Sequence, residues 1–181
     1  LLSEYLPLKI PGQKIPMLES LGRRLAVDVI AFQDVPGFTR STMDGYAVRA
    51  RDTYGASEGM PAYLDVCGEI PMGQAPRGEV KTGQCWRIAT GGMLPAGADA
   101  VVINEYTEEL DKHTIGITRP VAPGDNVVRR GEDISEGTAA LPAGHRIRPQ
   151  DLGLLSSIGL MEVEVVQPVR VGIISTGDEL V

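Results

Sequence analysis

The sequence contains few aromatic residues, histidines and cysteines. Phe, Trp and Tyr make up 4% of its 181 residues, so a core must be built mainly from Val, Ile, Leu and Ala. The two cysteines, Cys67 and Cys85, and the two histidines, His113 and His145, are scattered along the chain. This distribution argues against a Cys/His zinc site, which needs four clustered ligands. We expect both cysteines to be free thiols, as is usual in the cytosol.

Long apolar runs and an excess of positive charge are also missing. No stretch approaches the roughly 18 apolar residues of a membrane-spanning helix. The formal net charge is −7, so nucleic acid and anionic lipid are not expected as general partners. Residues 1–5 show no basic stretch leading into an apolar run, so no secretory signal is visible. These features predict a cytoplasmic protein without nucleic-acid or membrane partners.

Glycine and proline are abundant, with 22 and 13 residues, and they are spread along the chain. Such spacing is typical of many turns between short strands. Between about residues 46 and 130, short runs rich in β-formers alternate with turn residues, which predicts a small barrel or sandwich. The predicted strands are 62–67, 78–80, 85–89, 100–104 and 114–118.

The flanking segments have a different period. Leucines at i, i+3 and i+7 predict a short helix over 18–26, followed by an extended stretch to residue 32. Residues 135–147 are typical of a hairpin that turns at 142–144. A second helix is predicted from Pro149, with Gly159 as its C-terminal glycine, and a half-buried strand over 161–165.

The last segment, 169–174, is an almost continuous apolar run, typical of a strand buried on both faces. Residues 175–180 follow it like the first turn of a parallel α/β domain. We therefore expect 169–181 to be the start of a truncated α/β domain. The fold class predicted for the whole chain is mainly β with some α.

The stretch 34–48 contains the first candidate site. Asp44–Gly45 can be an ordinary tight turn, since both residues tolerate positive φ. Alternatively, the Asp44 carboxylate, beside the hydroxyls of Ser41 and Thr42, can hold Mg²⁺ or position a water. The residue types alone leave both interpretations open.

Two further stretches, 87–102 and 124–134, carry candidate anion-binding groups. Thr90 and Gly91 expose a hydroxyl and backbone N–H groups suited to an anion, or simply close a hairpin. Arg129 and Arg130 can bind phosphate oxygens bidentately, or form a solvated basic face. The neighbouring Asp133, which follows a glutamate, belongs either to a salt-bridged turn or to a metal-binding pair.

These stretches, together with 175–180, resemble in order and spacing four blocks of the MoeA family, which also occurs as the E domain of gephyrin. The resemblance covers nearly the whole chain. It implies a molybdopterin molybdenumtransferase, which inserts molybdate into adenylylated molybdopterin with release of AMP and with Mg²⁺. It places catalytic roles on Asp44, Thr90, Asp133 and Glu179, with Asp44 and Asp133 as metal ligands. The implied cofactor-binding residues are Ser41, Gly91, Arg129, Arg130, Ser175, Thr176, Gly177 and Asp178.

The resemblance also implies an architecture and a partner. Residues 1–30 and 131–168 would form a discontinuous, elongated dimerisation domain, 31–130 an inserted β domain, and 169–181 the start of the molybdopterin-binding α/β domain. A homodimer with a shared cleft is expected, and the 181 residues alone are expected to be inactive. The alternative is a gephyrin-like dimeric scaffold that binds a partner peptide.

Overall fold

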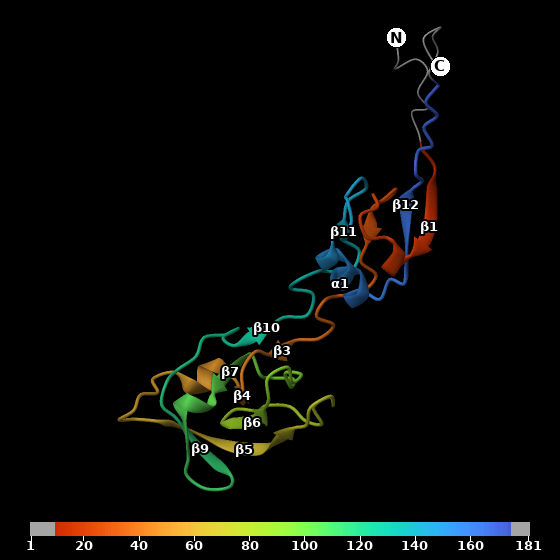
Figure 1. The fold of residues 1–181 in the computed structure, drawn as a ribbon. Helices are drawn as coiled ribbons and strands as arrows, with labels where there is room; N and C mark the ends of the chain where they lie inside the picture. The colour runs from red at the N-terminus through yellow and green to blue at the C-terminus, as the bar shows by residue number, and fades with distance from the viewer. Residues whose placement is uncertain (1–9, 175–181) are drawn as a thin grey trace. The chain divides into compact units, whose positions relative to one another are not determined.

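A computed structural model describes residues 10–174, which divide into two compact units (Figure 1). Residues 33–136 form the first, here called the central unit. Residues 10–32 and 137–174 form the second, here called the split unit. Strands dominate both, as the predicted fold class requires, and one α-helix is present in the described range. No helix between residues 10 and 174 is long and apolar enough to cross a membrane.

The central unit is built on a six-stranded sheet with the order β7-β4-β6-β5-β9-β8. All its pairings are antiparallel except the parallel pair β5 and β6. A separate short pair, β3 (Arg40–Ser41) with β10 (Val127–Val128), lies beside the sheet (Figure 1). The sheet strands are β4 (Gly45–Val48), β5 (Ala62–Ile70), β6 (Gln84–Ile88), β7 (Ala100–Ile103), β8 (Thr107–Glu109) and β9 (Thr114–Ile117). Single 3-10 turns cover Ala50–Thr53 (η2) and Asn104–Tyr106 (η3).

Alternate residues of the sheet enter two separate apolar clusters. Tyr46 and Val48 of β4 belong to the larger one, whereas Ala47 between them belongs to the smaller. A strand that is apolar at every position is therefore buried on both faces. The buried side chains are mostly Val, Ile, Leu and Ala, as the scarcity of aromatics predicted.

Gly45 is a strand residue and not part of a turn, so the tight-turn interpretation of Asp44–Gly45 is wrong. Gly45 pairs with Ile88 on one side and with Ile103 on the other. A Cβ atom there would lie 1.9 Å from the carbonyl oxygen of Val102. Glycine is required because the backbones approach closely, and Asp44 is left at the entrance to β4.

The split unit consists of short strands contributed by both of its segments. β1 (Gly12–Pro16) pairs with β12 (Glu162–Val166), and β2 (Val29–Ile30) pairs with β11 (Ala139–Leu141). The predicted second helix is confirmed as α1 (Pro149–Ser157), and Gly159 adopts a φ of 78° after its end. The predicted strand over 161–165 is confirmed as β12.

The helix predicted over 18–26 is wrong. One 3-10 turn, η1 (Met17–Glu19), is present, after which Arg24 and Leu25 form isolated bridges to Arg146 and Val165. Leu18 is 77% exposed and only Leu25 of the leucine series is buried. Pairing with the distant second segment therefore outweighs the local leucine spacing.

Three strand predictions also need correction. Residues 135–147 do not form a hairpin, because β11 and Arg146 pair with the first segment and not with each other. Residues 78–80 form no strand beyond a single bridge from Glu79 to Ala96. Residues 169–174 are neither paired nor buried, with Ile173 92% exposed. A strand becomes buried on both faces only when neighbours cover it, and no described element does so here.

A buried carboxylate, Asp151, fixes the start of α1. Its side chain is 4% exposed. It accepts hydrogen bonds from the backbone N–H of Arg148 at 2.7 Å and from the Arg148 guanidinium, and it lies 2.6 Å from Nε2 of His145. The Arg148 guanidinium, followed by His145 and the backbone N–H, lowers the pKa of this carboxyl strongly, against the opposing effect of burial.

We expect the stability of the split unit to fall under acid because of Asp151. A folded pKa below the ordinary value of 3.8 stabilises the fold above that pH, and the contribution is lost as the pH falls toward the folded pKa. Asp151→Asn should cost about 2 kcal/mol at pH 7, the order of a charge-assisted network, and should flatten the acid dependence. Hydrogen exchange of the α1 amides between pH 3 and pH 6 measures this, and an unchanged acid slope in the variant would contradict it.

Candidate functional site

The structure brings Asp44 and Thr90 together at one end of the central sheet. Asp44 precedes β4, and Thr90 lies two residues beyond the end of β6, the strand antiparallel to β4. Oδ1 of Asp44 accepts hydrogen bonds from the backbone N–H of Thr90 at 2.7 Å and from its hydroxyl at 3.0 Å. Residues 46 positions apart in sequence are thereby joined through one carboxylate oxygen, and both are exposed.

A tight turn presents Thr90. The backbone N–H of Gly92 bonds to the Ala89 carbonyl at 2.9 Å, and Gly91 has a φ of 80°, a conformation that favours glycine. The N–H of Gly91 donates to the carbonyl of Ser41 at 2.8 Å. The turn does not close a hairpin, because β4 lies between β6 and the next strand, β7. The hairpin-closing interpretation is therefore wrong, and anion binding by this turn stays a prediction.

Ser41 is 2% exposed, and its hydroxyl makes only local hydrogen bonds. It donates to the carbonyl of Met43 at 2.6 Å and lies 3.1 Å from the backbone N–H of Met43, which donates to it. Thr42 is held by a bond from its N–H to the carbonyl of Asn126 at 3.0 Å. Ser41 therefore shapes the bend that leads to Asp44, and its predicted contact with a ligand stays a prediction.

One carboxylate oxygen of Asp44 accepts hydrogen bonds, and the other is free to bind a ligand. The N–H of Thr90, followed by its hydroxyl, lowers the pKa of the carboxyl below its ordinary value, so Asp44 is ionised at neutral pH. Among residues 10–174, Oδ2 has no hydrogen-bond or ion-pair partner. An ionised carboxylate with a free oxygen is a suitable ligand for Mg²⁺, which is usually held by one or two carboxylates together with substrate phosphates.

The other predicted residues of the central unit lie on one tight loop, 129–133. The N–H of Arg129 donates to Oε2 of Glu132 at 2.7 Å, which closes the loop. Asp133 is exposed, and its backbone N–H donates to the carbonyl of Val35 at 3.0 Å. Within the described range, the carboxylate of Asp133 has no hydrogen-bond or ion-pair partner, and so it forms neither kind of interaction with Asp44 or Thr90.

The described residues therefore do not assemble the predicted metal pair on their own. Between residues 10 and 174, no group of three or more His, Cys, Asp or Glu side chains could enclose a metal ion. Joint metal binding by Asp44 and Asp133 stays a prediction. The remaining predicted residues, Ser175, Thr176, Gly177, Asp178 and Glu179, lie outside the described residues.

One residue beside loop 129–133, Asp34, is not singled out by any sequence pattern. Its Oδ2 accepts a hydrogen bond from Nε of Arg130 at 2.6 Å, and its Oδ1 accepts one from the backbone N–H of Glu136 at 2.8 Å. These bonds, the backbone one foremost, lower the pKa of the Asp34 carboxyl. The partners lie about a hundred positions away, so no local pattern could reveal them.

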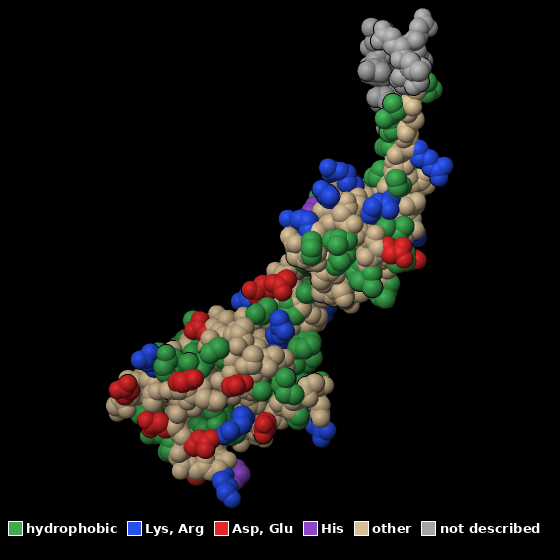
Figure 2. Space-filling model, viewed as in Figure 1, with side chains coloured by type: hydrophobic (Ala, Val, Ile, Leu, Met, Phe, Trp, Pro, Cys, Tyr) green, Lys and Arg blue, Asp and Glu red, His purple; other side chains and the backbone are tan. Residues whose placement is uncertain are grey.

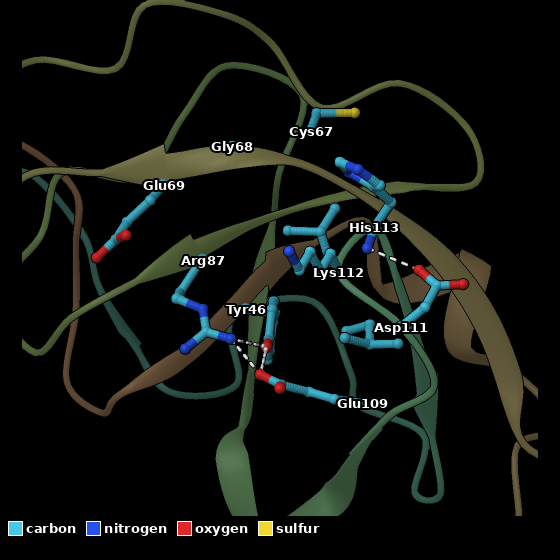
Figure 3. Close-up of a pocket in the computed structure, with 11 residues that line it drawn as sticks. Tyr46, Cys67, Gly68, Glu69, Arg87, Glu109, Asp111, Lys112 and His113 are labelled. Carbon is cyan, nitrogen blue, oxygen red and sulfur yellow. Dashed lines mark hydrogen bonds and ion pairs between the residues drawn. The ribbon is translucent and has the colours of Figure 1, made fainter.

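A pocket of the central unit, about 490 Å³, lies beside strands β4, β5 and β6 (Figure 3). Arg87 and Glu109 form an ion pair there, and the hydroxyl of Tyr46 lies 2.8 Å from Nη2 of Arg87 and 3.2 Å from Glu109. Carboxylates, a lysine and a histidine share the rim of this pocket. None of the predicted site residues lines it, and its mixed charges favour no single class of ligand.

Comparisons with known proteins agree with the resemblance seen in the sequence. The family model "MoeA N-terminal region (domain I and II)" matches residues 1–159. The molybdopterin molybdenumtransferase of Bacillus subtilis is 41% identical over 169 residues, which are 92% of this chain and 39% of that protein. The enzyme of the same name from Synechococcus elongatus is 36% identical over 183 residues, 100% of this chain and 45% of that protein.

A solved structure shares the fold. The crystal structure of the molybdopterin biosynthesis moeA protein from Pyrococcus horikoshii superposes with a TM-score of 0.81 and 40% identity, over 86% of this chain and 41% of that chain. The chain thus spans less than half the length of the proteins that it matches. The matched family model, the identity to curated relatives and the shared fold establish that this chain belongs to the MoeA family, within its N-terminal region.

Proposed function

We propose that this chain takes part in molybdenum cofactor biosynthesis, as part of a molybdopterin molybdenumtransferase that inserts molybdate into adenylylated molybdopterin and releases AMP. The observation that carries the proposal is the Asp44–Thr90 pair, an ionised carboxylate held by two donors of one residue with its second oxygen free. The relatives support this reaction class, because they are named molybdopterin molybdenumtransferases.

In this proposal the central unit supplies the polar groups of the site. Asp44 would hold Mg²⁺, with Asp133 as a second ligand, and the ion would supply Lewis-acid stabilisation of phosphate charge when bound. Thr90 fixes the orientation of the Asp44 carboxylate. The exposed arginines Arg129 and Arg130 bind phosphate or molybdate oxygens, because guanidinium groups match oxyanions bidentately.

We further propose that the split unit forms a homodimer contact. Figure 2 shows hydrophobic side chains gathered on the visible face of this unit. Leu18 is 77% exposed and Met161 is 76% exposed, and residues on the adjoining segments are also apolar and exposed. Large exposed apolar patches of soluble proteins often mark protein–protein contacts. A scaffold that binds a partner peptide is the alternative use of such a surface.

The experiment that tests the proposed function uses the full-length gene product that contains residues 1–181. We expect it to release AMP from adenylylated molybdopterin only when both molybdate and Mg²⁺ are present, with the B. subtilis enzyme as a positive control. AMP is quantified by chromatography, and incorporated molybdenum by elemental analysis. Molybdenum incorporation without AMP release, or release that is indifferent to EDTA, would contradict the proposed reaction.

A further inference from the structure

Asp34 lies where the two ends of the central unit run side by side. The isolated bridge between Val35 and Ile134 joins these segments. The Asp34 side chain is 17% exposed, and each of its oxygens has a different partner, the backbone N–H of Glu136 and Nε of Arg130. A carboxylate held in this way has a fixed orientation and can in turn orient whatever it binds.

The main chain of loop 129–133 is fixed largely without Asp34. The N–H of Gly131 donates to the carbonyl of Pro36 at 3.0 Å, and the N–H of Asp133 donates to the carbonyl of Val35 at 3.0 Å. The N–H of Arg130 lies 3.2 Å from the hydroxyl of Thr39. The contact that Asp34 adds to the loop is therefore one to a side chain, the guanidinium of Arg130.

That guanidinium has donors to spare. Arginine carries five N–H donors, and only Nε of Arg130 is engaged by Asp34. Within residues 10–174, neither terminal nitrogen has a partner, and the side chain is 62% exposed. With Nε anchored, the two terminal nitrogens present a planar edge to solvent, the geometry that binds carboxylate, phosphate or molybdate oxygens.

Gly131 leaves room for the Asp34 carboxylate that binds Arg130. Its φ is 70°, and a Cβ atom there would lie 3.0 Å from Oδ1 and 3.2 Å from Cγ of Asp34. A larger residue would press on the carboxylate that holds Arg130. Glycine at position 131 therefore allows the Asp34 carboxylate to lie close to the loop.

We propose that Asp34 is a positioning residue that orients the guanidinium of Arg130 toward an oxyanionic group of the substrate. The inference rests on the proposed function, in which Arg130 binds phosphate or molybdate oxygens. Asp34 does not touch the substrate itself. It restricts the rotamers of a long side chain before binding, and preorganised groups lose less entropy when the ligand arrives.

Asp34→Asn in the full-length protein tests the proposal. The amide keeps the size of the side chain and one acceptor oxygen for Glu136, but it loses the charge that holds Arg130. We expect the KM for adenylylated molybdopterin to rise roughly tenfold, the loss of about one charge-assisted hydrogen bond, with kcat changed less than about twofold. Arg130→Lys should give a similar rise, and the double variant should be no worse than either single one.

Asp28→Asn is the matched control. Its carboxylate accepts a hydrogen bond from the backbone N–H of Ala143 at 2.7 Å, and among residues 10–174 it forms no ion pair with an arginine. We expect this variant to keep the wild-type KM. A readout independent of activity is the ¹H–¹⁵N signal of Arg130 Nε, which should exchange slowly with water in the wild type and quickly in Asp34→Asn.

The outcomes separate two failures. An Asp34→Asn variant with the wild-type KM, while Arg130→Lys raises KM, overturns the positioning role and leaves the proposed function intact. A wild-type KM in Arg130→Lys overturns both the positioning role and the place of Arg130 in the site. Should Asp34→Asn fail to fold, fast exchange of Arg130 Nε in the folded wild type overturns the proposal, and slow exchange supports it.

Discussion

Replacing Asp44 by alanine in the full-length protein is expected to reduce AMP release by roughly 100-fold or more, the range observed when a preorganised polar group is removed from an active site. The side chain is exposed, and its two bonds go to a single residue, Thr90. Its loss therefore leaves the buried core of the sheet intact. The melting temperature should stay within a few degrees of the wild type.

Two companion variants show which property of Asp44 matters. Asp44→Asn keeps an acceptor for Thr90 but removes the charge, and it should be nearly as inactive if the carboxylate holds Mg²⁺. Asp125→Ala is the control, because Asp125 is another exposed aspartate of the central unit that accepts a backbone N–H, that of Ala122 at 2.8 Å. Near-wild-type activity in Asp44→Ala, or inactivity that only follows a collapsed melting temperature, would reduce Asp44 to a structural residue.

The second large effect concerns residues 1–181 on their own, which we expect to form a dimer without measurable turnover. The central unit offers an Asp44–Thr90 pair and a separate arginine loop, and the described residues enclose no metal by themselves. The relatives are more than twice as long, since the chain covers 39% and 45% of two of them. If the rest of such a protein orients the substrate, its absence removes up to roughly 7–11 kcal/mol of barrier lowering.

The prediction of dimerisation and the prediction of inactivity can be contradicted independently. A monomer mass by light scattering would remove the proposed role of the exposed Leu18 and Met161 without affecting the chemistry. Replacing Leu18 by a charged residue should shift the chain toward monomer. Since Leu18 is 77% exposed, that substitution removes little packing within the chain.

Several elements could be predicted because their signals are local. α1 follows from Pro149 at its first turn, apolar spacing and Gly159 at its end. The strands β5, β6, β7 and β9 follow from β-rich runs bounded by turn residues. The motif around Asp44 and the turn at Thr90 were recognised together, although only the structure shows that one carboxylate oxygen joins them.

The errors arise where distant partners decide the conformation. Residues 18–26 have helical leucine spacing, but the backbones of Arg24 and Leu25 pair with the second segment of the split unit. The sequence does not show why a glycine is required at a position. Gly45 is required because two backbones approach closely, but a glycine required for its positive φ in a turn has the same appearance in the sequence. Asp34 was overlooked because Arg130 lies 96 positions away.

The central claim is that this chain contributes the Asp44–Thr90 pair to a molybdate-inserting site. A single-turnover assay of AMP release tests this claim most directly. Wild-type full-length protein, its Asp44→Ala variant and residues 1–181 are each mixed with adenylylated molybdopterin, molybdate and Mg²⁺. We predict a rapid stoichiometric release of AMP by the wild type and none on that timescale by the other two. Release at the wild-type rate by Asp44→Ala, or by residues 1–181 alone, would contradict the account.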